Sequence, residues 1–164
     1  MSKNIPEVKF DRYDRGILEI LQRSGRASNQ EIADEIGLSP SPCLRRIRAL
    51  EEAGYIDGYV ALLNARQLNL TLASFVHISM DKHTPERFAE FERQVEKYPE
   101  VMECHLIVGQ SADYLLKIVV KDMDAYHKFL LHRLTKIEGV VGVQSSFVLS
   151  SSINKTALPI PESL

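Results

Sequence analysis

The chain has 164 residues, of which 45% are hydrophobic, and its formal net charge at pH 7 is −2. This length allows one large domain or two small ones, and the hydrophobic content is ordinary for a folded protein. A net charge this close to zero excludes binding to nucleic acid by bulk attraction. Any DNA binding must therefore come from a local basic patch, multiplied by oligomerisation.

The sequence contains no pattern typical of membrane insertion, metal binding or catalysis. Residues 1–8 lack a basic stretch followed by an apolar run, and no apolar span is long enough to cross a bilayer, so we expect a cytoplasmic protein without a membrane partner. Cys43 and Cys104 are expected to be reduced and buried, and the five histidines lack a metal-binding spacing. We predict neither a metal nor a cofactor. Enzyme activity is not expected either, because no nucleophile with its base, paired carboxylates or metal cluster is indicated.

The first predicted helix runs from about Arg12 to Ser24. Asp11 can cap its N-terminus, and Gly25 ends it. Its apolar side chains recur with helical spacing along one side, which indicates packing against neighbouring helices. They are Tyr13, Ile17, Ile20 and Leu21.

Residues 28–54 have the pattern of a helix, a turn and a second helix. Ser28 can accept hydrogen bonds from the opening turn while Glu31 reaches back to complete a capping box. Gly37 ends the first helix as a left-handed cap. Ser39 then serves as the N-cap of the second helix, which has a proline at its first position and continues to the end of this segment.

The second of these helices has an apolar face and a basic one. Short side chains at a helix N-terminus permit close approach to DNA, and guanidinium groups bind phosphates or guanine edges. A solvated basic face on a small helical domain is the alternative, but the tight turn between two capped helices favours a helix that reads DNA. The inner face consists of Leu44, Ile47 and Leu50, and the outer face and its flanks hold Ser41, Pro42, Arg45, Arg46 and Arg48.

The pattern changes after this three-helix unit. Residues 55–63 (YIDGYVALL) are rich in β-forming residues and predict a strand, interrupted by Gly58, and residues 64–72 are polar enough for a hinge. From residue 73 onward the hydrophobic pattern alternates between periods of two and of 3.6 residues. It predicts strands at 73–80, 101–108, 114–120 and 140–149 and helices at 84–98 and 122–136.

The resulting order βαββαβ predicts an α+β fold in which a ferredoxin-like sandwich carries its helices on one face of the sheet. Apolar residues also occupy the other face, so we expect a second copy to cover it through a twofold contact that pairs two DNA-reading helices. A monomer with scattered exposed apolar residues is the alternative. The residues concerned are Phe75, Ile107, Leu115, Val119 and Val148.

Nearly the whole chain resembles the Lrp/AsnC, or feast/famine, family of transcriptional regulators. The resemblance rests on FDRYDRGILEILQ, NQEIADEIGLSPSPCLRRIRALEEAGYIDGYVALLN, PEVMECHLIVG, DYLLK and DMDAYHKFL, of which LSPSPCLRRIRALEEAG is highly specific. It implies an N-terminal (winged) helix-turn-helix, a hinge strand, and a C-terminal ferredoxin-like, RAM-type domain that forms dimers and assembles further, usually to octamers. It also implies a small-molecule effector, typically an amino acid, bound between subunits.

The resemblance places DNA contacts in the turn motif and an effector pocket at the loop between the second and third strands of the C-terminal domain. That loop, GQSADY, has one residue more than the family's usual G-x-x-D-Y, which leaves the identity of the effector open. A glycine that turns a hairpin and an aspartate that caps a backbone amide are the alternative interpretation. The expected DNA-binding residues are Ser28, Asn29, Ser39, Ser41, Pro42, Arg45, Arg46 and Arg48, and the expected effector-binding residues are Gly109, Gln110, Ser111, Asp113 and Tyr114.

We therefore predict a sequence-specific regulator of amino-acid metabolism that binds double-stranded DNA and responds to an effector bound between subunits. The alternative is an architectural protein that binds DNA without a ligand and with little sequence preference. The expected domains are residues 1–54 for the helix-turn-helix, 55–72 for a strand and hinge linker, 73–154 for the effector-binding and oligomerisation domain, and 155–164 for a C-terminal tail.

Overall fold

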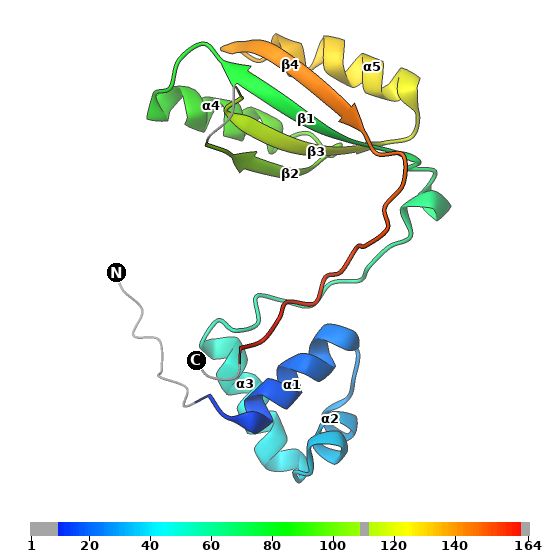
Figure 1. Cartoon of the computed structure of the whole chain (residues 1–164). Coiled ribbons are helices and arrows are strands. Elements are labelled where there is room, and N and C mark those ends of the chain that lie inside the picture. Colours follow the sequence, from blue (N-terminus) through cyan, green and yellow to red (C-terminus); the bar gives the residue numbers. More distant parts are fainter. Residues whose placement is uncertain (1–9, 109–111, 162–164) are drawn as a thin grey trace. The chain divides into compact units, whose positions relative to one another are not determined.

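The computed structural model describes residues 10–108 and 112–161. The chain forms two compact units (Figure 1). The helical unit comprises the chain through Leu62 together with the segment from Ile153 onward, and the sheet unit comprises Leu63–Ser152. No helix among the described residues is long and apolar enough to cross a membrane.

Three helices form the helical unit: α1 (Arg12–Arg23), α2 (Asn29–Ile36) and α3 (Pro40–Glu52). They confirm the three predicted helices. They enclose one apolar core, to which α3 contributes Cys43, whereas Leu44, predicted to face inward, is 39% exposed. Steps of four and three residues along α3 keep the buried side chains on one face. The buried residues of this core are Ile17, Ile20, Ile32, Ala33, Cys43, Ile47 and Leu50.

The predicted caps of α2 are present. The amide of Glu31 donates to Ser28 Oγ at 3.2 Å, and the amide of Ser28 donates to Glu31 Oε2 at 2.7 Å, which completes the capping box. Gly37 ends α2 in the left-handed conformation, with φ of 71°. Ser39 precedes α3 as predicted, but its side chain makes no cap hydrogen bond. The helix therefore begins with Pro40, which has no N–H that needs an acceptor.

The C-terminal segment returns to the helical unit. Gln22 Nε2 donates to the carbonyl oxygen of Leu158 at 3.1 Å, and Gln22 Oε1 accepts from the amide of Leu158 at 2.5 Å. One side chain thus satisfies both backbone polar groups of Leu158, as a neighbouring strand would. These two hydrogen bonds attach the segment to α1.

The strand predicted at residues 55–63 is wrong. Within the described part of the chain this segment pairs with no strand, and Val60 and Leu62 are 85% and 73% exposed. β-forming side chains do not make a strand without a neighbouring strand to complete the hydrogen-bond ladder. In the predicted hinge, a short 3₁₀ helix (Ala65–Leu68) follows Asn64, whose side chain caps it.

The sheet unit has the predicted order of strands and helices. Its four strands form one antiparallel sheet in the order β2-β3-β1-β4, with both helices on one face (Figure 1). This arrangement confirms the predicted α+β, ferredoxin-like sandwich. The elements are β1 (Leu72–Met80), α4 (Pro85–Val95), β2 (Val101–Leu106), β3 (Tyr114–Val120), α5 (Met123–His132) and β4 (Val140–Phe147).

The core of the sheet unit lies between the sheet and the two helices. Every second residue of β3, from Tyr114 to Val120, is buried, as the period-two pattern predicted. The ring of Tyr114 packs against Phe91 with a centroid distance of 4.6 Å and edge-on against Phe88 at 5.6 Å. The buried residues are Val76, Ile78, Met80, Phe91, Val95, Tyr114, Leu116, Ile118, Val120, Tyr126, Phe129, Leu134 and Ile137.

Strand β2 departs from a strict period-two pattern at a β-bulge. Its pairing with β3 shifts between Val101 and Glu103, and Val101 lies opposite Ile118. Met102 is 54% exposed, and Cys104, predicted to be buried, is only half-buried. A bulge adds one residue to a strand, so the alternation of inward and outward side chains does not carry across it.

Helix α5 ends earlier than predicted, at His132 instead of residue 136. The hydroxyl of Thr135 donates to the carbonyl oxygens of Leu130 and Leu131, at 3.1 and 3.3 Å. It thereby occupies acceptors that backbone amides would use in a continuing helix. Residues Leu134–Lys136 form a 3₁₀ turn instead.

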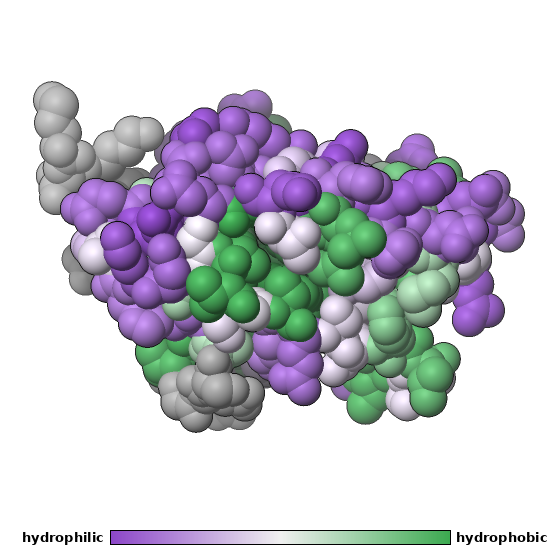
Figure 2. Space-filling model, turned by 90° about the horizontal axis from the view of Figure 1, so that it is seen from above, coloured by the Kyte–Doolittle hydropathy of each residue, from purple (hydrophilic) through white to green (hydrophobic). Residues whose placement is uncertain are grey.

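The sheet face opposite the helices keeps apolar side chains at its surface. Phe75 of β1 is 38% exposed, and the other residues predicted for this face are partly exposed. Figure 2 shows a different side of the sheet unit, seen from above β4 and α5, where further hydrophobic side chains lie at the surface among hydrophilic ones. The surface of the sheet unit therefore contains apolar area that a further copy could bury.

We expect Gly139→Ala to destabilise the sheet unit. Gly139 has φ of +93°, and an added Cβ would lie 2.6 Å from Arg87 Cδ and 2.9 Å from Asp81 Oδ1. The left-handed backbone and this crowding should lower the free energy of unfolding by about 2 kcal/mol, measured by urea denaturation. Gly58→Ala is the matched control, because an added Cβ there meets no atom within 4 Å. An equal loss in both variants would contradict this expectation.

Candidate DNA-binding surface and effector site

The outer face of α3 carries two arginines without a partner in the described part of the chain. Arg45 and Arg48 are exposed, and neither makes a hydrogen bond or an ion pair there. Ser39 and Ser41, at the start of the helix, are exposed as well, and Pro42 is half-buried. A helix N-terminus, small hydroxyl side chains and unpaired guanidinium groups thus share one exposed stretch of the chain, which suits an anionic ligand.

Arg46 does not belong to this exposed set. Its Nη1 donates to both carboxylate oxygens of Asp14, at 2.9 and 3.0 Å, and its Nη2 donates to Asp11 Oδ2 at 2.8 Å. Its Cζ lies 5.3 Å from the ring centroid of Tyr13. Asp14 is 2% exposed, so its carboxylate has little access to water. Arg46, predicted to contact DNA, is therefore the side chain that fastens α3 to the start of α1.

The charges in this cluster stabilise one another. Burial opposes the charged form of Arg46, but hydrogen bonds to Asp14 and Asp11 and their charges raise its pKa above the ordinary value. Burial also opposes the charged form of Asp11, but the amides of Asp14 and Tyr13 and the charge of Arg46 lower its pKa. The guanidinium group is therefore fully charged and committed to these two carboxylates.

Ser28 and Asn29 also have partners within the helical unit. Ser28 caps α2, and Asn29 Nδ2 donates to the carbonyl oxygen of Pro40 at 2.8 Å. The second bond ties the start of α2 to the start of α3. Asn29 Oδ1 is buried and has no hydrogen-bond partner among the described residues. Both side chains hold the turn motif in shape, a role that the sequence pattern does not separate from DNA contact.

The predicted effector residues fall at the end of the β2–β3 hairpin. Gly109, Gln110 and Ser111 lie outside the described residues. Asp113 and Tyr114, which lead into β3, are described, and the structure shows how each is bonded. Neither presents a free polar group to a ligand.

Asp113 uses its backbone and its side chain to fix the hairpin. Its amide donates to the carbonyl oxygen of Ile78 at 2.8 Å, and its carbonyl oxygen accepts from the amide of Ile107 at 2.8 Å. Its Oδ2 accepts from the amide of Met80 at 2.7 Å, and its Oδ1 lies 2.7 Å from Nε2 of His83. Both carboxylate oxygens therefore have partners, one at the end of β1 and one in the turn that follows it, and no sequence motif marked His83 as one of them.

Tyr114 belongs to the core of the sheet unit. Its side chain is fully buried, and its hydroxyl donates to Glu92 Oε1 at 2.8 Å. Burial and the hydrogen bond to Glu92 raise the pKa of Tyr114 above its ordinary value, so the hydroxyl stays protonated. Tyr114 supports the hairpin from the inside.

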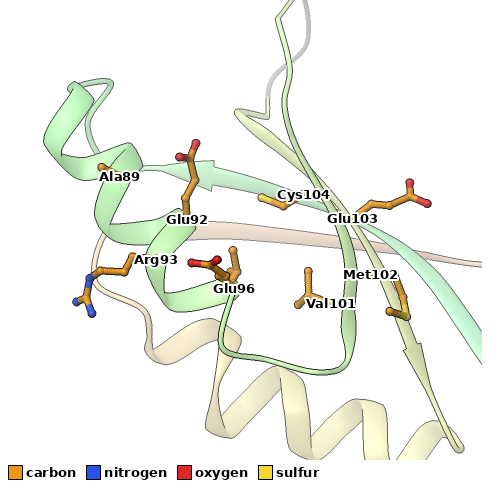
Figure 3. Close-up of a pocket in the computed structure, with 9 residues that line it drawn as sticks. Ala89, Glu92, Arg93, Glu96, Val101, Met102, Glu103 and Cys104 are labelled. Atoms are coloured by element: carbon orange, nitrogen blue, oxygen red, sulfur yellow. The ribbon is translucent and has the colours of Figure 1, made fainter. Parts of the chain in front are cut away.

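A cleft of about 630 Å³ lies between α4 and β2 (Figure 3). Three of the polar side chains that line it, Glu92, Arg93 and Glu103, have hydrogen-bond partners within the sheet unit. Burial and then the charge of Glu92 raise the pKa of Cys104, which also lines the cleft, to about 11. The thiol is therefore protonated at neutral pH and is a poor nucleophile. Among the described residues, no group of three or more histidine, cysteine, aspartate or glutamate side chains could hold a metal ion.

Two models of known protein families match the chain. Residues 10–57 match the winged helix-turn-helix DNA-binding model, and residues 73–158 match the Lrp/AsnC ligand binding domain. Among curated proteins, the Leucine-responsive regulatory protein of Escherichia coli (strain K12) is 45% identical over 148 residues, which cover 90% of each chain.

The chain is also similar to solved structures of transcriptional regulators. A transcriptional regulator of Neisseria meningitidis, in complex with L-Met, has a TM-score of 0.88 and 41% identity, with coverage of 92% of this chain and 96% of that one. An AsnC family transcriptional regulator of Agrobacterium tumefaciens has a TM-score of 0.86 and 39% identity, with coverage of 92% and 97%.

We expect Arg46→Ala to destabilise the helical unit because it leaves the carboxylate of Asp14 buried without a cation. The free energy of unfolding, measured by urea denaturation, should fall by about 3 kcal/mol. Arg23→Ala is the matched control, since Arg23 pairs with Glu35 across an exposed contact with side chains 65% and 55% accessible. It should cost at most about 1 kcal/mol. Similar losses of unfolding free energy in the two variants would show that the buried cluster stabilises the helical unit no more than an exposed ion pair does.

Proposed function

The chain belongs to the Lrp/AsnC family of transcriptional regulators, and we propose that it regulates genes of amino-acid metabolism by binding double-stranded DNA in response to a small-molecule effector. The observation that carries this proposal is the exposed face of α3, where Arg45 and Arg48 have no partner among the described residues. Guanidinium groups in this state can bind phosphates or guanine edges without first breaking an internal ion pair.

The residues of the turn motif divide into those that touch DNA and those that support the motif. Ser39 and Ser41 approach the phosphate backbone at the N-terminus of α3, where the helix dipole favours negative charge. Arg45 and Arg48 contact phosphates or base edges in the major groove. Pro42 follows Ser41 in the first turn of α3, where its short side chain permits close approach to DNA. The residues that act by holding the motif in shape are Ser28, Asn29 and Arg46.

The effector is proposed to be an amino acid that binds between subunits at the end of the β2–β3 hairpin. One similar protein is named for its response to leucine, and one similar structure is a complex with L-Met, so amino acids with apolar side chains are the first class to test. Gly109, Gln110 and Ser111 are proposed to bind it, because backbone amides and a hydroxyl can serve the carboxylate of an amino acid. Asp113 shapes the hairpin, since its carboxylate already has two partners.

The proposed assembly is a homodimer that associates further to an octamer. The apolar side chains on the sheet face opposite the helices, Phe75 among them, support the dimer because a twofold contact buries the same patch on both copies. A symmetric pair of α3 helices then suits a DNA site with two halves. The proposed location of this regulator is the cytoplasm.

We expect Arg45→Ala to weaken binding to DNA from upstream of the protein's own gene, as measured by fluorescence anisotropy. If Arg45 reads a base edge, the variant loses about 1–3 kcal/mol and much of its preference over scrambled DNA. If it binds a phosphate, the affinity of the protein for both DNAs falls alike. The slope of log K against log salt concentration then becomes shallower by about one. Arg93→Ala, on α4 of the sheet unit, removes the same charge and should leave both affinities unchanged. Unchanged affinity in Arg45→Ala would contradict the proposed DNA surface.

We also expect L-leucine or L-methionine to change the affinity for upstream DNA. A coupling of ordinary size would alter the apparent Kd about fivefold or more. The measurement is the same anisotropy titration, with L-leucine, L-methionine and then each of the other amino acids added singly at millimolar concentration and scrambled DNA as the control. A chain that binds both DNAs equally and responds to none of the twenty amino acids is an architectural protein, and this result would overturn the proposed regulation.

A further inference from the structure

The turn between β1 and α4 is braced by groups on both of its sides. The amide of Asp81 donates to the carbonyl oxygen of Gly139 at 2.8 Å, and Asp81 Oδ1 lies 3.2 Å from Nε of Arg87. The amide of Arg87 in turn donates to Oγ1 of Thr84 at 3.3 Å. Any side chain that projects from this turn therefore starts from a backbone of defined position.

His83 projects from this turn and reaches the end of another element. Its Nε2 lies 2.7 Å from Asp113 Oδ1, and its ring centroid lies 6.1 Å from that of Phe88. The side chain of His83 is 68% exposed, whereas that of Asp113 is 18% exposed. An exposed side chain is not enclosed by core packing, so the imidazole is oriented by two contacts, the ring of Phe88 on one side and the carboxylate of Asp113 at Nε2.

The partner of His83 controls the geometry of the β2–β3 hairpin. Asp113 bonds to Ile78 and Met80 of β1 and to Ile107, the residue that follows β2, through its amide, Oδ2 and carbonyl oxygen respectively. Rotation of its carboxylate would release the amide of Met80. A second donor on Oδ1 restricts that rotation, because it fixes the plane of the carboxylate.

We propose that His83 is a positioning residue for the effector response, because it clasps the end of the β2–β3 hairpin to the β1–α4 turn through Asp113. This inference rests on the proposed function, which puts effector recognition at the same hairpin. A binding loop whose ends are fixed before the ligand arrives loses less conformational freedom on binding. His83 thus contributes to effector affinity without touching the effector.

The test compares three substitutions of His83 in the full-length protein, with L-leucine and L-methionine as probes of the response to upstream DNA. His83→Ala removes the donor and should raise the effector concentration for half-maximal response about tenfold or more, as expected for the loss of one hydrogen bond to a charged group. His83→Gln should restore the response to within about twofold, because its amide nitrogen can occupy the place of Nε2. His83→Asn is too short and should behave like His83→Ala. Effector-free DNA affinity should stay unchanged in all three.

His105→Ala is the matched control, since His105 is an exposed histidine on β2 whose Nε2 lies 3.3 Å from Glu103. It should respond like the wild type. Hydrogen exchange of the peptide that contains Met80 should be faster in His83→Ala than in His83→Gln. The proposal is overturned if His83→Ala responds normally, or if His83→Gln is no better than His83→Ala. If the wild-type protein binds DNA but responds to neither probe, the proposed effector class is contradicted. The proposed role of His83 in the effector response is then contradicted as well.

Discussion

The buried carboxylate of Asp14 is the constraint on which the helical unit depends. Its side chain is 2% exposed, and a carboxylate taken out of water is strongly unfavourable unless a cation and hydrogen bonds replace the water. Arg46 provides both, and it does so from α3. Because Asn29 joins the starts of α2 and α3 as well, polar contacts and apolar packing together set the orientation of α3 within the unit. The exposed face of that helix is therefore displayed on a rigid support.

Internal partners also distinguish supporting charges from binding charges in the rest of the chain. Asp113 has a donor for each carboxylate oxygen, and Arg87 is paired with Asp81 and Glu138. Such groups would have to break existing contacts before they could bind anything else. Arg45 and Arg48 have no such cost, since neither has a partner among the described residues. The difference is physical and cannot be judged from residue type.

Local signals predicted most of the fold because the residues that produce them lie a few positions apart. The capping box of Ser28 and Glu31 and the alternation along β3 are examples. Partners distant in the sequence could not be predicted in this way. Arg46 stands 32 residues from Asp14, so residue type alone suggested a DNA contact. The strand predicted at residues 55–63 is absent for a related reason. A strand needs a neighbouring strand to pair with, and β-forming side chains do not show whether such a neighbour exists.

A chain with a net charge of −2 can hold DNA only if its positive charge is both concentrated and unpaired. Several arginines outside α3, such as Arg23 and Arg133, are neutralised by nearby glutamates. Affinity for DNA grows with the number of phosphates that a protein neutralises, so one α3 helix with two available guanidinium groups binds weakly. A second α3 on the same DNA raises the effective concentration of the first. In the proposed assembly, an effector that alters how copies associate therefore alters DNA affinity without contacting α3, which is why ligand recognition can reside in the sheet unit.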